Sequence, residues 1–227
     1  MKTIGLLGGM SWESTLEYYR IINEEVAKRL NGLHSAKIIL YSFDFDEIAE
    51  LQSQNRWNEL GEILAEKAEM LERAGADFIL ICTNTMHKVA DYVQSRINVP
   101  LLNIIDCVAE EVVKRGIKRV GLLGTKFTME DGFYEDGLRR YGLEVIIPDD
   151  EDRNEIHRII FEELCRGIFK EHSKRKLIEI IGRLKMKGAE GVILGCTELP
   201  LLVKEAEIPI FDSTKIHAVY AVEFALK

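Results

Sequence analysis

Two short segments of this 227-residue chain place thiols next to hydroxyl, amide and carboxyl groups. They are residues 82–87 (CTNTMH) and residues 195–200 (GCTELP). Each follows an apolar run that reads as a β-strand, and ligands of doubly wound sheets bind beyond the carboxyl ends of the strands. Thr and Asn oxygens also cap helix starts, where free N–H groups bind a carboxylate. The two segments are therefore the candidate site.

The four cysteines are expected to be reduced thiols, and none has the spacing of a zinc site. A free cysteine is most often a small buried residue, which is the reading we give to Cys107 and Cys165. Cys196 differs because it follows a glycine and precedes polar residues at an expected helix start. Such a setting lowers the pKa of a thiol, so Cys196 is predicted to supply a thiolate base.

The two segments belong to a repeat that spans the chain. Residues 4–9 (IGLLGG) return as 120–125 (VGLLGT), and 75–77 (GAD) return as 188–190 (GAE). If the spacing between residues 75–77 and their repeat at 188–190 is kept without a gap, Thr83, rather than Cys82, corresponds to Cys196. Because side chains alternate along a strand, Cys82 is then expected to face the core.

Short β-branched runs alternate with amphipathic stretches, which predicts an α/β protein with parallel sheets. Helices are expected at 13–30, with Leu16, Tyr19, Ile22, Val26 and Leu30 on one packed face, and at 57–73. Strands are expected at about 3–8, 36–41, 77–82, 100–103, 119–124, 143–147, 190–195 and 209–211. We predict two pseudo-symmetric lobes, each a parallel sheet of about four strands flanked by helices, with the site in the cleft between them. The expected parts are a first lobe at 1–103, a linker helix at 104–118, a second lobe at 119–212, and a C-terminal helix at 213–227 that packs back onto the first lobe.

Composition excludes several classes of function. A net charge of −8 without basic clusters argues against nucleic acid as a partner. The apolar run near the N-terminus is too short for a membrane span and wrongly flanked for a secretory signal, so a cytoplasmic protein is expected. The glycine-rich residues 5–11 match neither a dinucleotide fingerprint nor a Walker loop. They read either as an anion-binding nest or as a tight strand-to-helix turn.

Three motifs resemble the aspartate/glutamate racemase family: residues 4–10 (IGLLGGM), 83–87 (TNTMH) and 195–198 (GCTE). The resemblance covers nearly the whole chain and is strongest to bacterial L-aspartate/glutamate-specific racemases, which share 8–15 (GGMSWEST) and 82–87. It implies two facing α/β lobes, no cofactor and no metal, an amino acid substrate, and a homodimer.

In that family, one thiol from each lobe acts on opposite faces of the substrate α-carbon. Here the repeat places Thr83 where relatives carry the first thiol, and a hydroxyl is a poor base. The resemblance therefore predicts Cys196 and Thr83 as the catalytic pair. Cys196 would deprotonate the L-enantiomer of Asp or Glu and Thr83 would return a proton, so that racemisation is biased in one direction.

The resemblance also implies a set of residues that bind the substrate. Either Gln52 or nearby Gln54 could be the site glutamine, because both lie in a polar stretch that is ordinarily interpreted as a loop. His87 either orients a site group or is a core histidine whose ring nitrogens are hydrogen-bonded within the fold. Residues 44–47 and 164–166 lack the Arg and Lys pair with which some aspartate racemases bind the side-chain carboxylate. The implied substrate-binding residues are Met10, Gln52, Thr83, Asn84, Thr85, Thr197, Glu198 and Leu199.

Three other functions stay open at this point. Arylmalonate decarboxylases and hydantoin racemases share the lobe pair, and the decarboxylases need only the second thiol. A non-catalytic two-lobed binding protein is the third, but a binding site does not require a thiol at a helix start.

Overall fold

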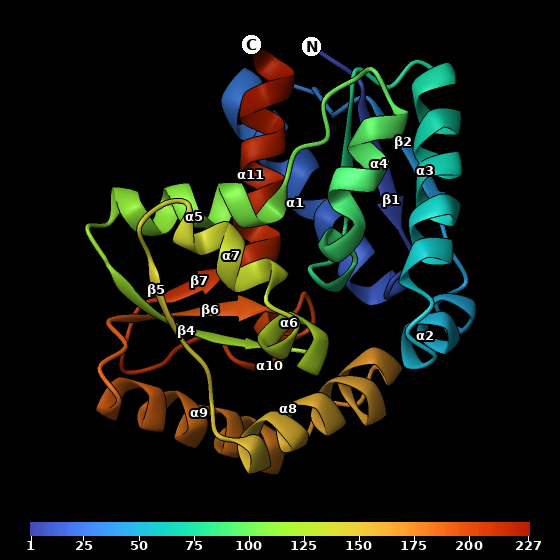
Figure 1. Cartoon of the computed structure of the whole chain (residues 1–227). Coiled ribbons are helices and arrows are strands. Elements are labelled where there is room, and N and C mark those ends of the chain that lie inside the picture. The colour runs from blue at the N-terminus through green and yellow to red at the C-terminus, as the bar shows by residue number, and fades with distance from the viewer. The chain divides into compact units, whose positions relative to one another are not determined.

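The chain forms two compact units (Figure 1), and the computed structural model describes all 227 residues. The first unit comprises Met1–Ile104 together with His217–Lys227, and the second comprises Ile105–Ile216. The chain thus leaves the first unit after Ile104 and re-enters it at His217. None of the helices combines the length and apolar character needed to span a lipid bilayer.

The first unit is built on a parallel three-stranded sheet in the order β2-β1-β3. Every residue of β1 and β3 is buried, as expected for strands covered on both faces. The elements are β1 (Ile4–Gly8), α1 (Trp12–Leu30), β2 (Ile38–Ser42), α2 (Phe45–Ser53), α3 (Trp57–Arg73), β3 (Phe78–Ile81), the 3-10 helix η1 (Thr85–Val89), α4 (Ala90–Arg96) and α11 (Ser213–Leu226).

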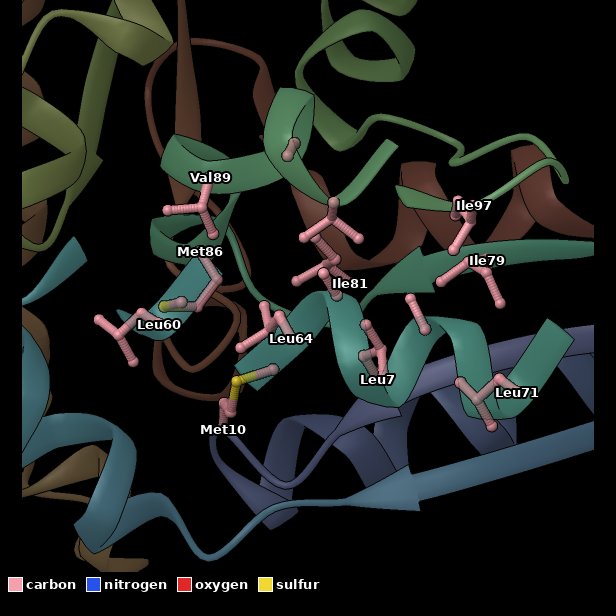
Figure 2. Packing of buried hydrophobic residues seen from close by; sticks show 14 of the residues in the cluster. Leu7, Met10, Leu60, Leu64, Leu71, Ile79, Ile81, Met86, Val89 and Ile97 are labelled. Atoms are coloured by element: carbon pink, nitrogen blue, oxygen red, sulfur yellow. The ribbon is translucent and has the colours of Figure 1, made fainter. Parts of the chain in front are cut away.

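Alternate strand residues enter two separate cores. Leu7 and Ile81 join a cluster under α3 and α4, and Figure 2 shows them among side chains that include Leu64 of α3. Leu6 and Cys82 join the other cluster, with α1 and α11. Cys82 is 0% exposed, and this burial raises the pKa of its thiol. The prediction that Cys82 is a core residue is confirmed.

The second unit contains a parallel four-stranded sheet in the order β5-β4-β6-β7. Figure 1 shows α8 and α9 on one face of this sheet and α5 and α7 on the other. The elements are α5 (Ile104–Lys114), β4 (Arg119–Gly124), α6 (Lys126–Glu130), α7 (Phe133–Arg139), β5 (Glu144–Ile146), α8 (Asp150–Glu162), the 3-10 helix η2 (Leu164–Arg166), α9 (Glu171–Met186), β6 (Gly191–Gly195), α10 (Leu199–Leu202) and β7 (Ile210–Asp212).

The two halves of the internal repeat pair their strands in the same register. In the first sheet Leu7 pairs with Ile81, and in the second Leu123 pairs with Leu194. Thr83 lies two residues beyond Ile81, and Cys196 lies two residues beyond Leu194. The register therefore makes Thr83 the structural equivalent of Cys196, as the repeat in the sequence predicts.

The predicted strand at 100–103 is wrong, because this stretch joins the first sheet only through one bridge between Ile79 and Leu101. The Leu102 carbonyl, which would accept the next bond of the ladder, instead accepts from Nε2 of His217 (2.8 Å), and the chain then enters α5 at Ile104. The first sheet consequently has three strands where about four were expected. The equivalent stretch of the second unit continues to Asp212 and is strand β7.

The predicted packing face of α1 is also wrong in part. Leu16 and Tyr19 are 56% and 52% exposed and Leu30 is exposed as well, whereas Ile22 and Val26 are buried as expected. The helix carries two apolar stripes, and the stripe that contains Tyr18 packs against the sheet. A hydrophobic period alone does not distinguish between two such stripes.

Candidate functional site

The first segment begins where β3 ends. Thr83, Asn84 and Thr85 are all buried, and they stand at the edge of the sheet where the neighbouring β1 also ends. The chain then tightens into η1, whose start is fixed by a bond from the His87 N–H to the Asn84 carbonyl (3.0 Å). The strand end and the tight turn together hold two hydroxyls and one amide in a small space.

Two further predicted residues lie in the same part of the first unit. Gln52 is buried on α2, and its amide donates to Sδ of Met86 (3.1 Å). Figure 2 shows Met10 and Met86 at the same end of the buried cluster. Gln54, by contrast, is exposed, and the polar stretch that reads as a loop is helix α2. Of the two glutamines, Gln52 is the one directed toward the segment after Thr85.

The glycine-rich start forms a tight turn between β1 and α1. Gly9 has a φ of 85°, and a Cβ there would lie 2.3 Å from the carbonyl oxygen of Phe43. Its N–H donates to Oγ1 of Thr15 (2.8 Å), so this donor is used within the fold rather than for binding an anion. Of the two interpretations of this turn, the structure supports the strand-to-helix turn.

The second segment surrounds a thiol with polar groups at the end of β6. The Cys196 thiol donates to Oε2 of Glu198 (2.9 Å), and the Thr197 hydroxyl donates to the same oxygen (3.0 Å). All three residues are buried, as is Leu199 at the start of α10. The Cys196 thiol, a proton donor, is thus in direct contact with the Glu198 carboxylate, a proton acceptor.

The expected lowering of the Cys196 pKa is wrong. Burial raises the pKa of this thiol, and the neighbouring Glu198 carboxylate and Cys165 raise it further. Helix α10 has four residues, so few aligned peptide dipoles are present to counter these effects. Cys196 therefore rests as a neutral thiol, and the group that can take its proton is the carboxylate it already contacts.

The sequence interpretation missed Glu13, which lies in the first turn of α1 directly after the glycine turn. Its Oε2 is buried and has no hydrogen-bond partner. Leaving a charged acceptor buried without a donor is costly, so such an atom is a candidate ligand for a cation. An acidic residue in a first helical turn is ordinarily explained by the helix dipole, which hid this signal.

Comparison with known proteins gives consistent results. Residues 7–221 match the sequence model described as Asp/Glu/Hydantoin racemase. The chain is 26% identical over 216 residues to the broad specificity amino-acid racemase RacX of Bacillus subtilis, covering 93% of this chain and 92% of that protein. It is 51% identical to a candidate Asp/Glu racemase of known structure from Yersinia pestis, with a TM-score of 0.92 and full coverage of both chains. An aspartate racemase homologue from Pyrococcus horikoshii OT3 is 44% identical, with a TM-score of 0.86 and full coverage of both chains.

Proposed function

The chain belongs to the Asp/Glu/hydantoin racemase family, and we propose that it is a cofactor-independent racemase of acidic amino acids. The observation that carries this proposal is the Cys196 thiol in hydrogen-bond contact with the Glu198 carboxylate at the end of β6. Thr83 occupies the equivalent position at the end of β3. In our proposal these two side chains act on opposite faces of the substrate α-carbon.

The first step uses the pair of Cys196 and Glu198. The thiol passes its proton to the carboxylate, and the resulting thiolate removes the α-proton of the L-enantiomer. Sulfur then carries the substrate proton, Glu198 holds the original one, and the substrate is a carbanion. Because burial disfavours a free thiolate, Glu198 lets the charge form only while the proton stays close by.

The second step uses the Thr83 hydroxyl. It gives its proton to the opposite face of the carbanion, directly or through water, and regains one from solvent. Glu198 releases its proton to solvent and Cys196 keeps the substrate proton, so the enzyme returns to its starting state. A hydroxyl donates to a strong base readily but rarely removes a proton, since its own pKa lies far above that of a thiol. Because the two enantiomers have equal free energy, kcat/KM must be the same in both directions, so the bias is expected in kcat, with L to D faster than D to L at saturating substrate.

Substrate contacts follow from the groups around the two strand ends. The polar side chains of Asn84, Thr85 and Thr197 suit the carboxylates of aspartate or glutamate, and Glu13 suits the α-ammonium. The residues we assign to the walls of the site are Met10, Gln52 and Leu199.

The experiment that tests this function follows hydrogen exchange at the α-carbon. The protein is incubated in deuterated water with L- and D-Asp, L- and D-Glu and a wider amino acid panel, and is analysed by proton NMR and chiral chromatography. Deuterium is expected at the α-position, with L-Asp or L-Glu faster than the D-enantiomers. Cys196→Ser is expected to abolish exchange, and Thr83→Cys to increase turnover of the D-enantiomer. Absence of exchange with every amino acid, or no change in Thr83→Cys with either enantiomer, would contradict the assignment.

A second candidate function is decarboxylation of a malonate, favoured by the presence of one thiol across the two equivalent positions. Decarboxylation breaks a carbon–carbon bond and leaves a carbanion that needs a single proton donor. Cys196 is a neutral thiol at rest and fits that role. Carbon dioxide release from an arylmalonate, without α-exchange of any amino acid, would select this function.

We also propose a homodimer. The support is the outward stripe of α1 made by Trp12, Leu16 and Tyr19, which leaves three large apolar side chains exposed on one helical face. Such stripes commonly mark contacts between proteins. Light scattering of the purified chain, in the wild type and in Leu16→Glu, tests the association.

A further inference from the structure

A buried histidine adjoins the turn that carries Thr83. One ring nitrogen of His87, Nδ1, lies 2.8 Å from the Thr83 carbonyl oxygen. The other, Nε2, accepts the backbone N–H of Ile104 at 3.1 Å. Because the Thr83 carbonyl only accepts and the Ile104 N–H only donates, both partners are satisfied by one state of the ring: neutral, with its proton on Nδ1. Burial lowers the pKa of His87 to about 4, which agrees with a neutral ring.

A second histidine packs against the first, with ring centroids 5.9 Å apart. Nε2 of His217 lies 2.8 Å from the Leu102 carbonyl, so it carries the proton, and Nδ1 accepts the Tyr18 hydroxyl at 2.8 Å. His217 touches neither Thr83 nor Ile104 in these bonds. It thus offers a matched neighbour that shares the burial of His87 but not its partners.

The two rings lie at the points where the chain passes between its units. Ile104, held by His87, is the last residue of the first unit before the chain leaves it, and His217 is the residue at which the chain returns. His87 therefore joins the turn after β3 to the start of helix α5 through one rigid ring. A rigid link of this kind fixes the position of the carbonyl of Thr83, and with it the side chains that start from that turn.

We propose that His87 is a positioning residue for proton delivery by Thr83, its ring tying the Thr83 carbonyl to the Ile104 N–H. This inference rests on the proposed racemase function. Displacement of a reacting group by about 1 Å slows a step by about a hundredfold. Loss of the tie should therefore slow delivery at the Thr83 face while leaving proton removal by Cys196 in place.

The test measures two products from L-Asp or L-Glu in deuterated water. Deuterated L-substrate reports return of a deuteron from Cys196 after the thiol has exchanged its proton with solvent, and D-product reports delivery from Thr83. His87→Gln keeps an acceptor for Ile104 but loses the bond to Thr83, and the ratio of deuterated L to D should rise about tenfold to a hundredfold. His87→Asn keeps a donor near Nδ1 but loses the acceptor for Ile104, so it also breaks the tie and its ratio should rise as well.

Tyr18→Phe is the control for simple destabilisation. It removes a hydrogen bond from the same buried cluster without touching either bond of His87, so its melting temperature should fall while its product ratio stays constant. A loss of folded protein lowers both products equally and leaves the ratio unchanged. If wild type turns over amino acids and neither His87→Gln nor His87→Asn changes the ratio, the positioning role is overturned. If wild type exchanges no amino acid at all, the proposed function fails and this inference fails with it.

Discussion

Acidification should weaken the fold through His87 and His217, both of which the interior holds neutral. Burial lowers the pKa of His87 to about 4 and, with the neighbouring His87 ring, that of His217 to about 3. In the unfolded chain both rings take up protons near their ordinary pKa of about 6.5. Below that pH the unfolded state binds more protons than the folded one, so stability falls as the pH falls. The contribution is intact above pH 6.5 and is lost progressively toward pH 4 and pH 3.

The size of the effect follows from these values. Each ring that titrates only in the unfolded state contributes a slope of about 1.4 kcal/mol per pH unit. Between pH 6.5 and pH 5 the two rings together remove about 3 kcal/mol, a large share of the roughly 5–15 kcal/mol that holds a typical protein folded. Over its full range His87 accounts for about 3 kcal/mol and His217 for about 5 kcal/mol.

Urea unfolding followed by circular dichroism at intervals from pH 4.5 to pH 7 measures this slope. His217→Gln removes one titrating ring while leaving an amide donor for Leu102, and its slope should be about 1.4 kcal/mol per pH unit smaller than that of wild type. His172→Gln is the control, because His172 is exposed and its replacement should leave the slope unchanged. Equal slopes for wild type and His217→Gln would refute the reasoning.

Four other predictions test the remaining assignments. Glu198→Gln should lower kcat about a hundredfold or more, because no carboxylate takes the thiol proton. Alkylation of Cys196 should nevertheless occur at lower pH, because the Glu198 charge that helps to raise the pKa of the thiol is gone. An unchanged pH profile of alkylation would contradict the coupling of Cys196 to Glu198. Glu13→Gln should raise KM about tenfold with a smaller effect on kcat, measured by initial rates, since a neutral amide binds the α-ammonium less well. Cys82→Ala should cost about 1–2 kcal/mol in urea unfolding but leave racemisation intact, whereas loss of activity would make Cys82 a site residue. Leu16→Glu should convert a dimer to a monomer by light scattering, and an unaltered mass would place any contact elsewhere.

Much of the fold could be predicted from the sequence, because strands such as β1 and β6 are continuous apolar runs and α3 has a regular apolar period. The errors have specific physical causes. The outward position of Leu16 depends on which stripe of α1 packs against the sheet, and the early end of pairing at Leu101 depends on the bond from distant His217 to the Leu102 carbonyl. Both are set by contacts between distant segments, and a local pattern does not contain them.

For the candidate site, too, some features could be predicted from the sequence and others could not. The repeat led to Thr83 as the equivalent of Cys196, because register is a property of spacing. The raised pKa of Cys196 could not be predicted, since it depends on burial and on the direction of the Glu198 side chain. For Glu13, the informative feature is a missing partner, which only a three-dimensional structure can reveal.

The discontinuous first unit has a consequence for biosynthesis. Its core includes Ala218, Ala221 and Val222 of α11, and the backbone N–H of Lys2 donates to the Ala225 carbonyl (2.9 Å). A ribosome makes these partners only after it has made the whole of the second unit. The second unit, contiguous from Ile105 to Ile216, can close while translation proceeds, whereas β1 must wait with one face uncovered. The first unit is thus expected to complete its fold after the second, although its synthesis begins first, and a nascent chain stalled before residue 217 should expose the Tyr18 side of the first sheet to chaperones and proteases.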